Sequence, residues 1–111
     1  MHNLRISLSA AAMFLSSTAS ANWDGVTNGK INGIDVTTGQ NYGFRVSLVG
    51  APKLCGSNHG WAYLNQNDSN YQTYVAVLLA AKMADKAVTI FANRESTSGS
   101  NYCKIGYVAL R

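Results

Sequence analysis

Apolar and polar residues alternate along several short segments of the chain, as they do in strands that bury one face. The alternation is clearest in residues 44–49, whose apolar members are expected to face a core while Arg45 and Ser47 face outward. The same reasoning predicts four further strands, at residues 30–36, 60–64, 88–92 and 102–110.

Two of these strands carry additional signals. Gly33 interrupts the alternation of the first strand and predicts a bulge or tight bend, while residues 38–41 have the composition of a hairpin turn. The last strand is expected to carry four residues on one face: Cys103, Ile105, Tyr107 and Ala109.

One segment has the three- and four-residue spacing of an amphipathic helix, from residue 70 or 71 to about residue 84. Ser69 followed by Gln72 predicts a capping box at its start, and Asp68 places negative charge at the positive end of the helix dipole. The expected core stripe of the helix is Tyr71, Tyr74, Val75, Leu78 and Ala81.

Three strands, a helix and two strands follow one another in this prediction. That is the layout of the OB-fold, a five-stranded Greek-key barrel with a helix between its third and fourth strands. The sequence therefore predicts a mainly β fold with one α-helix, an OB-fold domain in the order β-β-β-α-β-β, over residues 22–111.

The predicted helix is more apolar than a single barrel requires. Residues 75–81 are all apolar, and a small domain seldom exposes such a surface. Either small alanines are tolerated there and loops cover the rest, or the helix forms a subunit interface. The candidate interface residues are Val77, Leu79, Ala80 and Met83.

Residues 1–21 have the organisation of a secretory signal peptide. Arg5 precedes an apolar run at residues 6–15, and Ala19-Ser20-Ala21 is a small-x-small site with cleavage expected after Ala21. The apolar run is about 10 residues, shorter than the ~20 of a membrane-spanning helix. We therefore expect a secreted or periplasmic bacterial protein.

Two cysteines, Cys55 and Cys103, follow the predicted signal peptide. In an oxidising compartment an even pair in a small domain indicates a disulfide, which would stabilise a thin core. A metal site or redox motif is the competing interpretation, but the pair lacks Cys-x-x-Cys spacing. We also predict no cofactor.

Charge adds little to the picture. The formal net charge is +4, and the basic residues are scattered singly without a basic run. We therefore do not expect nucleic acid as a partner, although attraction to anionic surfaces or acidic glycans is compatible with this charge.

Few residues suggest catalysis. His59 is the single histidine after residue 21, and the five acids do not form an obvious pair. A hydrolase would need His59 next to an acid or a serine in the fold, and a zinc site would need more ligands than these. We predict no catalytic and no metal residues, and a protein that is not an enzyme.

Residues suited to recognition are better represented. Tryptophans and tyrosines are numerous, and they lie among asparagine and glutamine side chains that orient hydroxyl groups. Trp61 and Tyr63 share one face of a predicted strand, so they either fill the barrel or contribute to a binding surface.

Several residues together resemble a known family. Trp23-Asp24-Gly25 follows the export signal, Trp61 follows Cys55, Val88-Thr89-Ile90 forms a strand, and Cys103 lies in the last strand; the helix carries Tyr74, Leu78 and Ala81. This pattern resembles the receptor-binding B subunits of bacterial AB5 toxins, the subtilase-cytotoxin group in particular. It is also similar to small exported bacterial proteins without an assigned function.

The resemblance implies a pentameric, glycan-binding ring whose helices line its centre. The sugar-binding serine of those subunits has no matching position here. The resemblance therefore suggests the fold and the class of binding, and it identifies no specific binding residue. We therefore predict a non-catalytic domain that binds a glycan or a protein, with a periplasmic inhibitor or accessory protein as the alternative. The candidate binding residues lie at one rim: Tyr42, Asn58, His59, Asn65 and Asp68.

Overall fold

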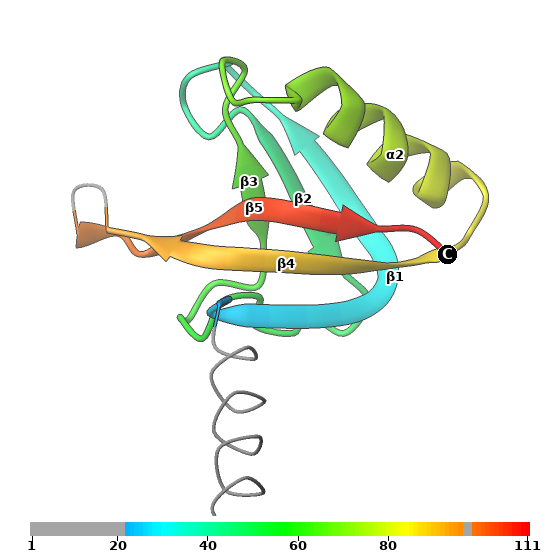
Figure 1. Cartoon of the computed structure of the whole chain (residues 1–111), viewed down its shortest axis with the longest axis horizontal. Helices are drawn as coiled ribbons and strands as arrows, with labels where there is room; N and C mark the ends of the chain where they lie inside the picture. The colour runs from blue at the N-terminus through cyan, green and yellow to red at the C-terminus, as the bar shows by residue number, and fades with distance from the viewer. Residues whose placement is uncertain (1–21, 97–98) are drawn as a thin grey trace, which may run out of the picture.

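The computed structural model describes residues 22–96 and 99–111 of the chain. The predicted signal peptide and its cleavage site lie outside these residues. The described part is mainly β with one helix and five strands, which confirms this much of the prediction (Figure 1). Its elements are β1 (Gly25–Val36), β2 (Phe44–Leu48), β3 (Ala62–Leu64), α2 (Tyr71–Met83), β4 (Ala87–Glu95) and β5 (Tyr102–Ala109).

The five strands pair in the order β1-β2-β3-β5-β4, and β4 pairs back to β1, so that the sheet closes into a barrel. Strand β1 makes this closure by bending: residues 25–30 pair with β4, and residues 31–36 pair with β2. The register shifts between Ile31 and Gly33, which confirms the irregularity predicted at Gly33. The extra residue bends β1, so that one half of the strand pairs with β4 and the other half with β2.

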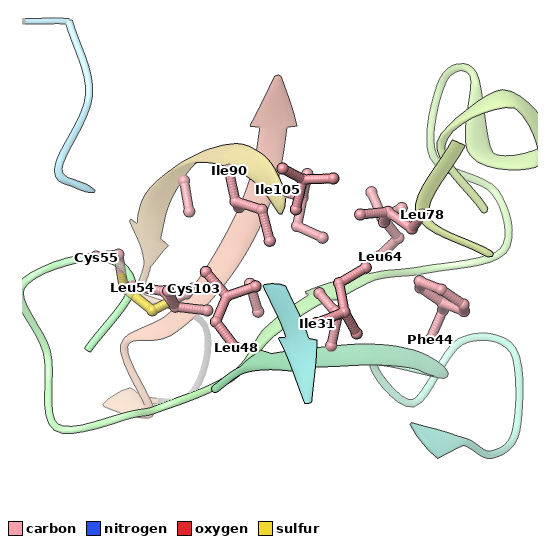
Figure 2. Close-up of a cluster of buried hydrophobic side chains, with 14 of the residues drawn as sticks. Ile31, Phe44, Leu48, Leu54, Cys55, Leu64, Leu78, Ile90, Cys103 and Ile105 are labelled. Atoms are coloured by element: carbon pink, nitrogen blue, oxygen red, sulfur yellow. A yellow bond between two sulfur atoms is a disulfide. The ribbon is translucent and has the colours of Figure 1, made fainter. Parts of the chain in front are cut away.

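The interior of the barrel is apolar. Phe44, Val46 and Leu48 are buried, as the alternation of β2 predicted. Residues from all five strands and from α2 meet them in one cluster, shown in Figure 2. The cluster includes Ile31, Leu54, Leu64, Leu78, Ile90 and Ile105.

Helix α2 lies beside one end of the barrel (Figure 1). Its predicted stripe is confirmed, since Leu78 and Ala81 are buried and Tyr71, Tyr74 and Val75 pack against the core. The helix ends at Met83, close to the expected residue 84.

The predicted capping box at Ser69 and Gln72 is wrong. Asn70 is the N-cap residue, in a left-handed conformation with φ of 61°, and no side chain caps the helix. The backbone N–H of Tyr71 instead donates to the carbonyl oxygen of Asp68. The carboxylate of Asp68 accepts from the N–H of Asn65, so it serves the preceding loop instead of the helix.

The predicted face of β5 is wrong in its second half. Cys103 and Ile105 are buried, but the β4–β5 register shifts opposite Gly106, and Tyr107 turns outward beside Phe91. Val108 packs against the core in place of the expected residues 107 and 109. A Cβ at residue 106 would lie only 2.5 Å from the Trp23 ring, which explains a glycine at this position.

The disulfide Cys55–Cys103 is confirmed. Its Cα atoms are 5.5 Å apart, and both residues are fully buried at the edge of the core (Figure 2). The bond links the segment between β2 and β3 to the start of β5. The described residues include no helix long and apolar enough to span a membrane.

Replacing both cysteines, as Cys55→Ala with Cys103→Ala, should lower the free energy of unfolding by about 4 kcal/mol, because the bond closes a long loop and restricts the unfolded chain. Urea unfolding monitored by circular dichroism measures the loss. A loss below about 1 kcal/mol would contradict this prediction, since loop closure alone accounts for more.

Candidate functional site

Five ring side chains gather on the outside of the barrel, over β3 and the start of β5. We call Tyr42, His59, Trp61, Tyr63 and Tyr102 the ring cluster. Tyr102 is its centre, with its ring centroid 4.8 Å from Tyr42, 4.9 Å from His59 and 4.8 Å from Trp61. Tyr42 also contacts Tyr63 at 4.7 Å. Three of these pairs are edge-to-face and the Trp61–Tyr102 pair is tilted, and ring pairs at these separations are favourable.

The two-residue period of the strands places the ring cluster outside. Ala62 and Leu64 belong to the interior cluster, so Tyr63 between them faces the other way, opposite Arg45 on β2 and Lys104 on β5. Trp61 and Tyr63 therefore do not fill the barrel. Cys103 points inward for the same reason, and Tyr102 points outward.

Arg45 supports the ring cluster from β2. Its Nε donates to the carbonyl oxygen of Tyr42 at 2.8 Å, and its Nη2 donates to that of Asn41 at 3.1 Å. Its guanidinium carbon lies 4.9 Å from the centre of the Trp61 ring, within the range of a cation–π contact. One side chain thus holds the 38–42 turn beside the indole.

Three of the predicted binding residues meet in a chain of polar contacts. The N–H of Tyr42 donates to Asn65 Oδ1 at 2.8 Å, and the N–H of Asn65 donates to Asp68 Oδ2 at 2.7 Å. Asp68 Oδ1 forms an ion pair with Lys104 Nζ at 3.0 Å. These contacts hold Tyr42 in a left-handed conformation with φ of 52°. Asn65 and Asp68 therefore position the site, and Tyr42 presents its ring there.

The structure brings His59 into the site and leaves Asn58 beside it. The His59 ring lies against Tyr102, and its Nε2 is 2.9 Å from the carbonyl oxygen of Ser100. The hydroxyl of Ser57 accepts from the backbone N–H of His59. Asn58 is exposed and lines a neighbouring hollow with His59, Arg94 and Asn101.

Four residues of the ring cluster and its support were not among the predicted binding residues: Arg45, Trp61, Tyr63 and Tyr102. They could have been found among the alternate residues of β2, β3 and β5 that face away from the core. The alternation of β2 predicted that Arg45 faces outward, but it did not predict which residues of other strands lie beside it. Those neighbours depend on strand pairing, and β3 and β5 pair in parallel although 40 residues separate the paired positions.

Three of the four predicted interface residues are exposed on α2, and Val77 is not. Leu79 is 45% exposed and Met83 is 85% exposed, and Ala80 is also exposed. Val77 is half-buried and lines an apolar hollow with Tyr74 and Tyr107.

The environment of Tyr63 changes the pKa of its phenol. Burial raises the pKa of the Tyr63 phenol to about 12, and the nearby negative charge of Glu95 acts in the same direction. The neutral hydroxyl is therefore favoured in the folded state.

Within the part of the chain that the structure describes, no three histidine, cysteine or acidic side chains are placed to hold a metal ion. Comparison with models of protein families, with curated proteins and with solved structures found no match. The site is therefore interpreted from its own geometry.

The raised pKa of Tyr63 predicts a specific loss of stability in alkali. The unfolded chain releases this proton near pH 10 and the folded chain near pH 12, so the free energy of unfolding should fall as the pH rises through this interval. Urea unfolding at pH 9, 10, 11 and 12 should show a steeper fall for the parent than for Tyr63→Phe. Parallel curves for the two proteins would contradict the assignment.

Proposed function

We propose that the chain is a secreted or periplasmic, non-catalytic binding domain with an OB-fold, and that its ring cluster forms part of a glycan-binding surface. The closed order β1-β2-β3-β5-β4, with a helix between β3 and β4, supports the OB-fold assignment. A buried disulfide is compatible with an extracellular or periplasmic location.

The observation that carries the proposal is the ring cluster outside the core. Aromatic side chains usually contribute most where they fill an interior, yet here four half-buried rings pack with the buried Tyr63 outside the core cluster, and Arg45 contacts two of these residues, Tyr42 and Trp61. Aromatic walls combined with a few oriented polar groups are typical of small-ligand sites. Sugars suit such walls, because their C–H faces are apolar and their edges carry hydroxyl groups.

Exposed amides border the ring cluster. Asn41 lies in the turn that Arg45 holds, and Asn58 and Asn101 lie on the loops next to His59 and Tyr102. An amide both donates and accepts hydrogen bonds, which matches the hydroxyl groups of a glycan.

The contacts of His59 support a non-catalytic role. General base catalysis requires an imidazole nitrogen directed at the proton it will remove, and a serine nucleophile must lie within reach of it. Nε2 of His59 is instead bonded to a backbone carbonyl, and the Ser57 hydroxyl contacts the backbone of His59. The imidazole packs against Tyr102 and links its own loop to the backbone of Ser100.

A glycan array with the protein lacking residues 1–21 tests the proposal. We expect selective binding that falls about tenfold or more in Trp61→Ala, because the indole supplies apolar contact surface. Trp23→Ala is the matched control, since Trp23 packs with Phe91 and Tyr107 on another part of the barrel. A blank array would contradict glycan binding and favour the inhibitor or accessory protein.

We also propose that the chain forms a homo-oligomer through α2. The exposure of Leu79 and Met83 on one helix favours this, because such apolar surface is usually covered. The resemblance to toxin B subunits makes a pentamer the expected assembly.

Light scattering at micromolar concentration should give a mass several times that of one chain, and Leu79→Lys with Met83→Lys should reduce it to a monomer, because lysine resists burial. Val49→Lys is the control, since Val49 is 62% exposed and lies outside the helix. A monomeric parent protein would overturn the proposed assembly.

A further inference from the structure

A shallow hollow lies beside the ring cluster, on the outer face of β1 and β2. Its volume is about 430 Å³, and its lining residues are Asp35, Arg45, Ser47, Ala51, Gly60 and Trp61. None of the predicted binding residues lies in it, but it shares Arg45 and Trp61 with the site described above. The hollow is thus an extension of the aromatic surface with a different set of polar groups.

The strand register builds the polar side of the hollow. Asp35 on β1 is the direct partner of Arg45 on β2, and Ser47 is two residues along β2 on the same face. A carboxylate and a hydroxyl therefore project from neighbouring rigid strands toward the same space. Side chains held on strands are positioned more accurately than side chains on loops.

The opposite side of the hollow is apolar and closely packed. A Cβ on Gly60 would lie 3.3 Å from the carbonyl oxygen of Ala51, so the segments that carry Ala51 and Trp61 approach each other through a glycine. Ala51 is itself in a left-handed conformation with φ of 50°. The methyl group of Ala51 and the indole of Trp61 supply the apolar wall.

The charges of the hollow discriminate between ligands. Arg45 uses Nε and Nη2 on backbone carbonyls and stacks on Trp61, so two of its five N–H donors are already engaged and its charge lies against the indole. In residues 22–96 and 99–111, the carboxylates of Asp24, Asp68 and Asp85 form ion pairs, whereas Asp35 forms none. A carboxylate of this kind accepts hydrogen bonds from neutral hydroxyl groups and repels another carboxylate.

We propose that this hollow binds one neutral hexose of a glycan, with Asp35 and Ser47 bonding adjacent hydroxyl groups and Trp61 and Ala51 contacting the C–H face of the sugar. The inference rests on the proposed glycan-binding function and narrows it to an uncharged terminal sugar. Asp35 is then the residue that determines specificity, because it selects hydroxyl groups over acidic groups.

Binding of polymer-bound galactose, glucose, mannose and N-acetylneuraminic acid to the protein without residues 1–21 tests this inference. We expect at least one neutral conjugate to bind, the acidic conjugate to bind at least tenfold more weakly, and Asp35→Asn to weaken the neutral conjugate about tenfold, since hydrogen bonds to a charged group are worth more than neutral ones. Asp85→Asn is the matched control: it removes the same charge from an exposed carboxylate paired only with Lys30. It should leave binding unchanged.

The outcomes separate this inference from the function on which it rests. A conjugate that binds, depends on Trp61 and is unaffected by Asp35→Asn overturns the hollow as the sugar site and leaves glycan binding in place. Preferred binding of the acidic conjugate, unchanged or strengthened by Asp35→Asn, overturns the neutral specificity alone. No binding of any conjugate, together with a blank glycan array, overturns both.

Discussion

The disulfide Cys55–Cys103 is the constraint on which the arrangement of the outer surface depends. The segment between β2 and β3 has no regular structure, and it carries Ala51, His59, Gly60 and Trp61. The covalent link fastens this segment to β5 one residue from Tyr102, the centre of the ring cluster. A covalent link matters more in a small domain, because such a domain buries a smaller share of its surface than a large one. The bond therefore stabilises the core and the candidate site at the same time.

On the other side of the ring cluster, noncovalent contacts hold the 38–42 turn in place. Arg45 joins the 38–42 turn to Trp61, and the contacts from Tyr42 through Asn65 and Asp68 to Lys104 join the same turn to β5. Exposed ion pairs contribute little stability, but the side chain of Asp68 is only 13% exposed and is also hydrogen-bonded. The surface is consequently preorganised, which reduces the entropy lost when a ligand binds.

The two proposed binding surfaces lie on different parts of the molecule. The ring cluster and the adjoining hollow lie over β1, β2, β3 and the start of β5, whereas Leu79 and Met83 lie on α2. An assembly built through α2 would leave the sugar surface of every copy accessible. Weak contacts of single hexoses would then add up, because linked sites raise the effective concentration of the ligand.

Much of the fold could be predicted because its signals are local. The alternation at Phe44, Val46 and Leu48, the irregularity at Gly33 and the stripe of α2 each arise within one element. The cysteine pair was also readable, since two cysteines in an oxidising compartment allow one partner each. Of the site, Tyr42, His59, Asn65 and Asp68 were predicted from loop composition, while their roles as ring partners or positioning groups were not.

Sequence alone therefore determined which faces of β2 and α2 are buried, because burial follows the periodicity of one strand or helix. Apart from the cysteine pair, tertiary structure decided the contacts that depend on a partner distant in sequence. The Gly106 bulge in β5 follows from pairing with β4 and from the Trp23 ring above it, and the carboxylate of Asp68 bonds Asn65 of the loop instead of capping the helix that begins at Tyr71. The ring cluster exists only because β3 and β5 lie side by side, a contact that no local pattern encodes.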